Sequence, residues 1–395
     1  MKRLVILGST GSIGENALKV AAALPDRLRV VGLSAHGRAG RLMEQARQFG
    51  VSRVALADPA RADEARRLAA PGTRLLVGGE GVAELAALPE ADIVLCGLVG
   101  MSGLKPVLAA LQARHDVALA TKEVLVSAGE LVMAERQRQG VRILPVDSEH
   151  SALFQCLHGA ACTAACVRTP SPAARLETGL RRLLLTASGG PFAGTPGRDL
   201  ETVTPAQALA HPRWSMGRKV TIDSATMMNK GLEIMEAHWL FDMPVDRIDV
   251  VIHPESVVHS LVEFVDGTML AQLAPADMRY AIQHALLWPE RVDAGLPPLA
   301  LSDLARLHFH APDEGRFPCL RLARAAAVAG RSCPAVLNAA NEVAVAAFLD
   351  GRIGFADIGR TVERVLQSHA PVAVERIDDV LAVDAWARRA AGERL

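Results

Sequence analysis

Short apolar runs alternate with helical patterns over residues 1–150. The apolar runs lie at 3–7, 29–33, 53–57, 92–96, 116–120 and 142–146. The stretches that repeat apolar residues at helical spacing are 40–50, 60–70, 104–113 and 128–139. Strands that alternate with helices predict a doubly wound parallel sheet of the Rossmann-like α/β class. Ligands bind such sheets beyond the carboxyl ends of the strands, so polar residues at that edge are the candidates for chemistry.

The pattern changes after residue 150 and predicts further domains. Residues 151–290 combine a helical pattern with apolar runs, which is typical of an α+β domain. The runs lie at 183–186, 250–252, 257–265 and 268–273, and Asp266-Gly267 between the last two predicts a β-hairpin. Residues 291–318 are rich in proline and predict a linker. Helical patterns at 319–329, 334–349, 355–368 and 378–391 predict a C-terminal helical bundle over 319–395.

The composition narrows the class of ligand. Lys plus Arg and Asp plus Glu both number 43, and aromatic residues make up only 4% of the 395 residues. Zero net charge with few aromatic stacking platforms gives no reason to expect nucleic acid or an anionic membrane as a partner. The most apolar stretch, 93–111, is interrupted by glycines, Lys105 and Pro106, so it does not predict a membrane span.

The N-terminus and the cysteines favour a cytoplasmic protein. The chain enters a predicted strand within two residues, so we expect no signal peptide. No pair of cysteines forms Cys-x-x-Cys, so buried thiols in a reducing compartment fit better than a zinc site. The cysteines are Cys96, Cys156, Cys162, Cys166, Cys319 and Cys333.

A glycine motif follows the first predicted strand directly. Gly8, Gly11 and Gly14 stand between that strand and a helical pattern. Glycine lets the backbone turn tightly and lets a pyrophosphate approach the N–H groups of the helix N-terminus. The motif predicts a dinucleotide site, and the alternative is an ordinary strand-to-helix turn.

The loop after the second predicted strand indicates which dinucleotide binds. An NAD site usually has an acid here, which binds the ribose 2′-hydroxyl. From the end of this strand to Glu44 the chain has no acid, and it has His36, Arg38 and Arg41 instead. These cations suit a 2′-phosphate and favour NADP(H) over NAD(H); the alternative is that they bind no ligand.

Three carboxylates stand in two short polar segments. Asp147 and Glu149 follow the sixth predicted strand, and in an extended chain their side chains project to the same side. Glu233 follows Asn229 and Lys230 in the second segment. Oxygens from the first pair, joined by a third from elsewhere, predict a site for Mg²⁺ or Mn²⁺. The alternative is that they are solvated surface acids.

Hydroxyl and amide donors lie close to these acids in the sequence. Ser188 and two glycines follow a predicted strand and make an anion cradle. Ser224, Asn229 and Lys230 precede Glu233 and supply the donors that a small phosphorylated substrate requires. The alternative is that Ser224 caps an ordinary helix on which the other two are merely exposed.

The polar segment 211–219 has Trp214 at its middle. One interpretation is a lid, in which Trp214 and Met216 cover a ligand while Gly217 permits motion. The other is a surface loop with one tucked tryptophan.

Eight sequence strings, in order along nearly the whole chain, resemble the 1-deoxy-D-xylulose-5-phosphate reductoisomerase family. They are GSTGSIG at 8–14, LATKE at 119–123, PVDSEH at 145–150, LLTASGGPF at 184–192, HPRWSMGRK at 211–219, TIDSATMMNKGLE at 221–233, HPESVVHSLVEF at 253–264 and LNAANEVAVAAFL at 337–349. The resemblance implies an enzyme that uses NADPH and a divalent cation to make 2-C-methyl-D-erythritol 4-phosphate in non-mevalonate isoprenoid biosynthesis. It also implies a homodimer joined through the middle domain.

Matching positions imply roles for individual residues. The implied metal ligands are Asp147, Glu149 and Glu233. The residues implied to contact the carbon chain of the sugar phosphate are Lys122, Ser148 and Glu149. Those implied to hold its phosphate are Ser188, Ser224, Asn229 and Lys230, with His211 and Trp214 on the lid. The implied cofactor residues are Thr10, Gly11, Ser12, Ile13, Glu123 and Gly217. Gly37 and Arg38 are expected to join them because they lie in the cationic loop after the second strand, not because of the resemblance.

The chain departs from the family pattern at several places. Ala35-His36-Gly37-Arg38 replaces a loop that is commonly Ala-Gly-x-Asn, and Thr121 replaces an asparagine. Ala281 stands where a proline is common, and the stretch 162–180 matches nothing in the family, so we expect it to lie away from the site. Two rival functions fit less well. A semialdehyde dehydrogenase needs a catalytic cysteine in a polar turn, and an NADPH-binding sensor needs no convergent carboxylates.

Overall fold

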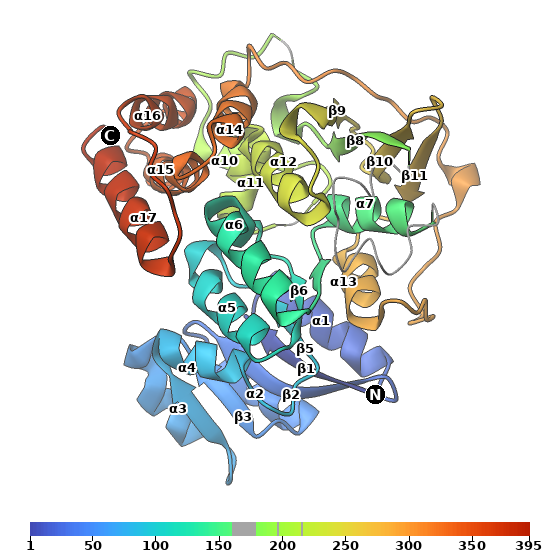
Figure 1. Ribbon diagram of the computed structural model, residues 1–395, viewed down its shortest axis with the longest axis vertical. Coiled ribbons are helices and arrows are strands. Elements are labelled where there is room, and N and C mark those ends of the chain that lie inside the picture. Colours follow the sequence, from blue (N-terminus) through green and yellow to red (C-terminus); the bar gives the residue numbers. More distant parts are fainter. Residues whose placement is uncertain (160–178, 196, 215) are drawn as a thin grey trace.

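The N-terminal part of the protein is built around a parallel sheet. The computed structural model describes residues 1–159, 179–195, 197–214 and 216–395 (Figure 1). Seven parallel strands run in the order β4-β3-β2-β1-β5-β6-β7. They are β1 (Lys2–Leu7), β2 (Leu28–Ala35), β3 (Arg53–Leu56), β4 (Arg74–Val77), β5 (Ile93–Cys96), β6 (Asp116–Leu119) and β7 (Ile143–Pro145). The order reverses between β1 and β5, which is where doubly wound sheets bind ligands, and the predicted fold class is confirmed.

Helices cover both faces of this sheet because its strands are apolar on both sides. They are α1 (Ser12–Ala23), α2 (Ala39–Phe49), α3 (Ala62–Leu68), α4 (Gly78–Ala86), α5 (Leu104–Gln112) and α6 (Lys122–Gln139). Leu4 and Ile6 belong to the core shared with α1 and α2. Val5 and Leu7 belong to the core shared with α4, α5 and α6. This alternation is the period of two that a strand imposes on its side chains.

The second sheet is smaller and mixed, in the order β11-β10-β8-β9. Its strands are β8 (Leu180–Ala187), β9 (Ile248–Ile252), β10 (Val258–Phe264) and β11 (Met269–Leu273). The predicted hairpin at Asp266-Gly267 is confirmed: the Phe264 amide donates to the Thr268 carbonyl at 2.9 Å. Helix α7 (Ser148–Gly159) packs on this sheet, while α13 (Met278–Leu287) packs on α1 of the first domain.

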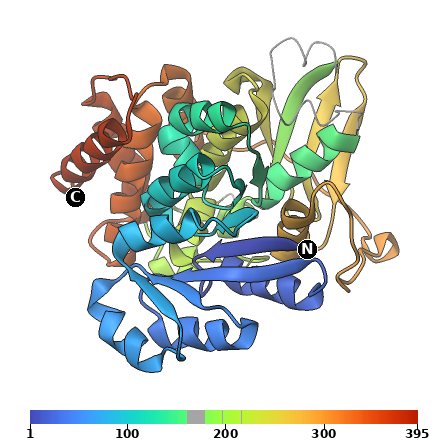
Figure 2. The same ribbon diagram turned by 60° about the horizontal axis from the view of Figure 1, so that its bottom comes forward.

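Helix α12 (Met228–Phe241) lies between the domains and packs on α6 and on the C-terminal helices. Those helices are α14 (Pro318–Ala329), α15 (Cys333–Leu349), α16 (Phe355–Gln367) and α17 (Ile377–Gly392), which confirms the four predicted there (Figures 1 and 2). The approach of α12 and α14 is so close that a Cβ on Gly231 would lie 2.3 Å from that of Ala323. The short helix α11 (Arg218–Ala225) leads directly into α12.

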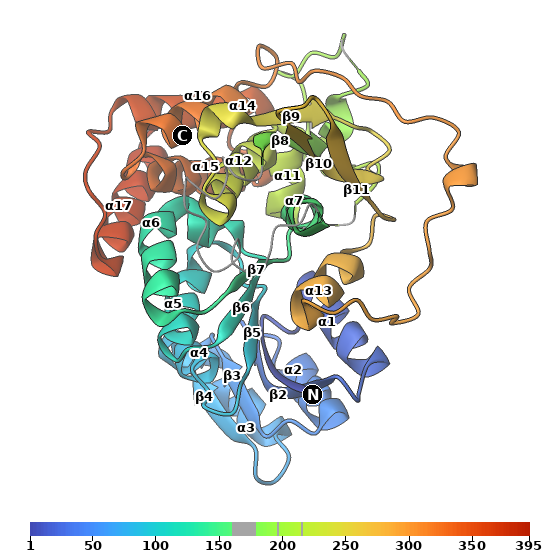
Figure 3. The ribbon, with the colours of Figure 1, turned by 45° about the vertical axis from the view of Figure 1, so that its right-hand side comes forward.

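The connection between α13 and α14 has little regular structure and runs along one side of the molecule (Figure 3). It is fastened to the second sheet by a β-bridge between Ile252 and His310. The His308 ring also bonds the Glu255 carboxylate at 2.6 Å. Among the described residues, no helix is both long and apolar enough to cross a membrane.

Candidate functional site

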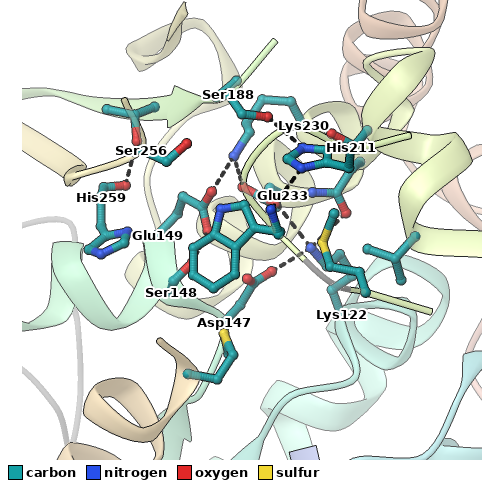
Figure 4. Close-up of a pocket in the computed structure, with 18 of the residues that line it drawn as sticks. Lys122, Asp147, Ser148, Glu149, Ser188, His211, Lys230, Glu233, Ser256 and His259 are labelled. Atoms are coloured by element: carbon teal, nitrogen blue, oxygen red, sulfur yellow. Dashed lines mark hydrogen bonds and ion pairs between the residues drawn. The ribbon is translucent and has the colours of Figure 1, made fainter. Parts of the chain in front are cut away.

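A cavity of about 220 Å³ lies at the carboxyl edge of the large sheet, where α11, α12 and the second sheet meet it (Figure 4). Its polar lining residues are Ser12, Lys122, Asp147, Ser148, Glu149, Thr186, Ser188, His211, Ser224, Asn229, Lys230, Glu233, Ser256 and His259. Its apolar lining residues include Ile13, Trp214, Met216, Val220, Met227 and Met278. The cavity therefore joins the glycine motif, the acids, the serine segments and the 211–219 segment.

Two lysines and three acids form the centre of this cavity. The Lys122 ammonium contacts the Asp147 carboxylate and lies 3.1 Å from Oε1 of Glu233. The Lys230 ammonium contacts Glu233 and lies 2.8 Å from Oε1 of Glu149. Glu233 is thus the acid that both lysines share. It is also the most deeply buried of the three, because it projects from α12 into the cavity floor.

The charges of this cluster do not balance, since three carboxylates face two ammonium groups. Although burial opposes ionisation, Lys230 holds the pKa of Glu149 below its usual range. Burial, together with repulsion from Glu149, raises the pKa of Glu233 to about 7. Burial opposes the charge of Lys122, but Asp147 and Glu233 hold its pKa well above its usual value. The cluster therefore favours additional positive charge.

The backbone at Glu149 differs from the extended chain that we expected. Strand β7 ends at Pro145 and α7 begins at Ser148, so Glu149 lies in the first turn of a helix. The period-two argument that paired it with Asp147 is therefore wrong. The two carboxylates still face the same cavity, and Ser148 donates to Oε2 of Glu149 at 2.6 Å.

His150 forms a second layer behind the acids. Ligand atoms of Asp147, His150 and Glu233 lie within 4.8 Å of one another. The His150 ring is fully buried, however, and its Nε2 lies 2.9 Å from the backbone oxygen of Glu233. Burial lowers the pKa of His150 to about 4, so the ring is neutral. Of the carboxylates, Asp147, Glu149 and Glu233 are the three that line the cavity.

Hydrogen-bond donors gather at the end of the cavity opposite Asp147 (Figure 4). Ser188 follows β8, and its hydroxyl lies 2.9 Å from Nε2 of His211. Backbone amides of Arg213 and Trp214 donate to Nδ1 of His211, so the proton of the neutral ring is on Nε2. Burial lowers the pKa of His211, which favours this neutral form.

The serine and asparagine of the 221–233 segment reach the cavity from two different helices. Ser224 lies in the last turn of α11, so the alternative in which it caps a helix is wrong. The cap of α12 is Met227, which has a left-handed backbone. Asn229 accepts from Lys122 at 2.9 Å and donates to Oε1 of Glu233 at 2.5 Å. The donors predicted from the sequence therefore lie beside the acids.

The glycine motif forms the expected tight turn beside the cavity. Gly8 has φ +83°, and a Cβ on Gly14 would lie 2.4 Å from the Gly8 carbonyl oxygen. Ser12 and Ile13, which line the cavity, open α1. Of the other expected cofactor residues, Gly217 also lines the cavity, whereas Thr10, Gly11, Gly37, Arg38 and Glu123 lie outside it.

The three cations expected near the 2′-phosphate differ in their surroundings. Arg41 pairs with Glu15 at 2.8 Å and with Glu44 at 2.7 Å, so its charge is already compensated. Arg38 is exposed and donates to the backbone oxygen of Thr10 at 3.1 Å. His36 is exposed in the same loop. The loop thus places Arg38 directly against the glycine motif.

Sequence reasoning missed several residues that line the cavity, among them Ser256 and His259. Ser256 is buried with φ +55°, and its hydroxyl has no partner among the described residues. His259 is the second residue of β10, and its ring bonds the backbone oxygen of Ala274 at 3.1 Å. Both lie in the string 253–264, which resembled the family, but neither stands beside other candidate residues in the sequence.

The four cysteines that the structure describes do not line this cavity. Cys96, Cys156, Cys319 and Cys333 are buried and form no disulfide. Burial raises the pKa of Cys156 to about 11 and that of Cys319 to about 12, so neither is a reactive thiolate. The expectations about Cys162, Cys166 and most of 162–180 lie outside the described residues.

A Rossmann-like sheet whose glycine motif opens into a cavity of acids, lysines and hydroxyls defines a class of dinucleotide-dependent enzymes with a small anionic substrate. Family models match three parts of the chain. The description 1-deoxy-D-xylulose 5-phosphate reductoisomerase matches residues 4–129, and its C-terminal domain matches 143–241. A DXP reductoisomerase C-terminal domain matches 273–390.

Relatives and solved structures agree with these matches. The 1-deoxy-D-xylulose 5-phosphate reductoisomerase of Pseudomonas fluorescens (strain Pf0-1) is 50% identical, over 100% of this chain and 98% of the relative. That of Methylococcus capsulatus is 51% identical, over 99% and 98%. A solved structure from Zymomonas mobilis in complex with NADPH is 40% identical, with a TM-score of 0.90 over 100% and 98% of the two chains. A DOX-P reductoisomerase solved with NADPH, fosmidomycin and magnesium is 40% identical, with a TM-score of 0.93 over the same shares. The chain therefore belongs to the 1-deoxy-D-xylulose 5-phosphate reductoisomerase family.

Proposed function

We propose that the protein converts 1-deoxy-D-xylulose 5-phosphate to 2-C-methyl-D-erythritol 4-phosphate, with NADPH as reductant and a divalent cation, in non-mevalonate isoprenoid biosynthesis. The observation that carries this proposal is the cavity itself. One space holds an acid cluster, a set of phosphate-type donors and the glycine motif. A sensor of NADPH has no use for such a cluster, and a cysteine-dependent dehydrogenase has no use for these buried, high-pKa thiols.

The acid cluster fits Mg²⁺ or Mn²⁺. Asp147, Glu149 and Glu233 offer hard oxygen ligands. Within the described cavity lining these three carboxylates pair with two ammonium groups, so the cluster is short of positive charge. We assign these three as the ligands. The ion, when bound, supplies Lewis-acid stabilisation of negative charge on the oxygens of the substrate.

The side chains of the protein then orient the sugar phosphate. Lys122 lies at the acid end, where its ammonium is fixed by Asp147 and Glu233 and faces oxygens that gain charge as the carbon skeleton rearranges. Ser148 and Glu149 lie beside it and contact the carbon chain. At the other end Ser188, Ser224, Asn229 and Lys230 hold the phosphate, and His211 donates to Ser188.

The cofactor binds across the glycine motif. Thr10, Gly11, Ser12 and Ile13 hold its phosphates at the N-terminus of α1, and Gly37 and Arg38 lie at the 2′-phosphate. Glu123 and Gly217 lie along the cofactor between this motif and the substrate. NADPH supplies the hydride that reduces the rearranged aldehyde, and Trp214 with Met216 excludes water from that step.

The assay measures the oxidation of NADPH in the presence of 1-deoxy-D-xylulose 5-phosphate. The reaction is monitored as the loss of NADPH absorbance. We expect turnover that EDTA abolishes and that excess Mg²⁺ or Mn²⁺ restores. The product is identified by mass and by NMR as a branched methyl tetritol phosphate. Turnover that EDTA does not change would contradict the requirement for a metal ion. Absence of turnover with every divalent cation would contradict the proposed function.

We also propose that the protein is a cytoplasmic homodimer. The support for the dimer is the edge strand β11, on which Met269 and Leu270 are exposed, with Val265 exposed in the adjoining turn. The support for the cytoplasm is that the four described cysteines are buried and form no disulfide with one another, as is usual in a reducing compartment.

A further inference from the structure

Four polar side chains link three helices beside the cofactor side of the cavity. Lys219 of α11 lies 3.0 Å from Oε1 of Glu123 at the start of α6, and 2.8 Å from Oδ2 of Asp223 on its own helix. The Nδ2 group of Asn341, in the C-terminal helix α15, donates to Oδ1 of Asp223 at 2.8 Å. Glu123, Asp223 and Asn341 are all buried. The series therefore runs from the C-terminal bundle through α11 to α6 of the first domain.

The helix at the centre of this series forms a wall of the cavity. Gly217, which caps α11, and Val220 in its first turn line the same space as Ser12 and Ile13 of the glycine motif. Lys219 stands between Gly217 and Val220 in the sequence, and its bond to Glu123 sets the distance between α11 and α6. The position of α11 therefore defines the cofactor side of the site.

Asp223 needs a partner on each of its oxygens because a buried carboxylate is costly to leave unsatisfied. Lys219 satisfies Oδ2 and Asn341 satisfies Oδ1. Without Asn341, Oδ1 would lack a donor and Asp223 would be drawn wholly toward Lys219. That shift would loosen the contact between Lys219 and Glu123, because the two carboxylates share one ammonium group.

We propose that Asn341 is a positioning residue for NADPH: it fixes Asp223, and through Lys219 it holds α11 and Glu123 in place for the cofactor. This inference rests on the proposed function, because it takes NADPH to be the ligand of the glycine motif. It gives the C-terminal helical region a part in the cofactor site, although no residue of that region lines the cavity within the described chain.

The chain provides a matched control in Asn338. This residue lies one turn earlier on α15 and is equally buried. Its Nδ2 donates to Oε1 of Glu342 at 3.1 Å rather than to Asp223. The side-chain oxygens of both asparagines lack a partner within the described residues, so the two sites differ mainly in the group that each amide holds.

The experiment compares Asn341→Ala with Asn338→Ala in the full-length protein. We measure the Kd for NADPH by fluorescence titration, the KM values for NADPH and for 1-deoxy-D-xylulose 5-phosphate, and thermal melting. We expect Asn341→Ala to raise Kd and KM for NADPH about tenfold, the effect of losing one hydrogen bond to a charged group, with the KM for the sugar phosphate within about twofold of wild type. Asn338→Ala should lower the melting temperature to a similar degree and leave NADPH binding unchanged.

Equal NADPH binding by wild type and Asn341→Ala would overturn the inference, and so would equal weakening by the two alanine variants. If Asn341→Ala does not fold, Asn341→Leu tests the same contact with a side chain of similar shape. Leucine has no group that can donate to Asp223, so it should weaken NADPH binding at least as much, and normal binding would refute the role. A wild-type protein that binds no NADPH would instead contradict the proposed function.

Discussion

At Glu233, burial and function oppose each other. An isolated buried carboxylate is costly, and here Glu149 adds repulsion, so the pKa of Glu233 rises to about 7. Two lysines and an asparagine keep the side chain in place. Such an arrangement is poor for stability and good for binding a divalent cation, because the ion supplies the charge that the cluster lacks.

We predict that Glu233→Gln removes most turnover and leaves the fold intact. The amide loses an anionic ligand, which weakens charge stabilisation by a few kcal/mol, or roughly 100-fold or more in kcat/KM. Melting should not fall, because the neutral amide no longer repels Glu149. The measurements are steady-state kinetics over a Mg²⁺ titration, and thermal melting. Near-normal kcat at saturating Mg²⁺ would show that Glu233 is not a metal ligand.

Arg38 gives a second prediction at this scale. It is exposed beside the glycine motif, whereas Arg41 is paired with Glu15 and Glu44. We expect the protein to prefer NADPH strongly, and Arg38→Asp to narrow the ratio of kcat/KM for NADPH over NADH by at least tenfold. The change removes a phosphate-binding cation and supplies an acceptor for the 2′-hydroxyl. Arg41→Asp is the comparison, and a larger effect there would move the 2′-phosphate contact to Arg41.

The residues found from the sequence are those whose neighbours in the chain also carry chemistry. Asp147, Glu149, Lys230 and Glu233 stand in dense polar segments next to apolar runs, so their spacing was informative. His259 and Ser256 stand among valines, and only the fold brings them to the cavity. The prediction of an extended backbone at Glu149 was wrong for a related reason. The three residues 147–149 do not by themselves show where a strand ends and a helix begins.

At the scale of elements, the regularity of the apolar pattern decided what the sequence could predict. Long periodic segments such as those of α15 and α16 were found almost to the residue. Strand β4 and helix α4 were missed. Strand β4 has only four residues, and α4 opens with Gly78 and Gly79, which are poor helix formers. Helix α13 was also missed, because its apolar face is recognisable only once α1 is there to cover it.

The turn between β1 and α1 gives a prediction about an element. A Cβ on Gly14 would lie 2.4 Å from Gly8 O and from Ser9 Cα, whereas a Cβ on Gly11 would lie 3.4 Å from the same oxygen. We expect Gly14→Ala to destabilise the protein by about 1–3 kcal/mol through overpacking, and Gly11→Ala to change stability little. Chemical denaturation of both variants measures this. Equal stability of the two variants would show that the turn accommodates a Cβ at Gly14 without a loss of folding free energy.

The segment 211–219 gives another prediction about an element. Trp214 is half-buried over the cavity, with its amide bonded to His211 and its ring 6.2 Å from that of His259. We predict that Trp214→Ala raises KM for the sugar phosphate and lowers kcat together, with little change in melting temperature. A tryptophan of the core would cost roughly 3–5 kcal/mol on truncation. A large loss of stability with unchanged kcat would place Trp214 in the core and leave no lid there.

At the scale of the whole molecule, the site exists because three folding units meet on α12. Glu233 and Lys230 come from α12 itself, and Lys122 comes from α6 of the first domain. The other two acids follow β7, and the serine cradle follows β8. The C-terminal bundle packs on the opposite side of α12 and α6 through Met228, Leu232 and Val126. The bundle therefore holds the two helices that carry the lysines at a fixed separation.

The surface of the second sheet gives the last prediction. Strand β11 is an edge strand, and Leu270 on it is 43% exposed, which is an association hazard unless another copy covers it. A stable dimer buries about 800 Å² on each partner, and a charge at the centre of such a patch opposes burial. We expect Leu270→Lys to convert a dimer into a folded monomer in sedimentation velocity. The matched control is Val328→Lys on α14, which is 75% exposed and far along the chain, and which should leave the dimer intact. If the Leu270→Lys protein sediments as a dimer like the wild type, this edge is not the interface. If the wild-type protein sediments as a monomer, the proposal of a dimer is wrong.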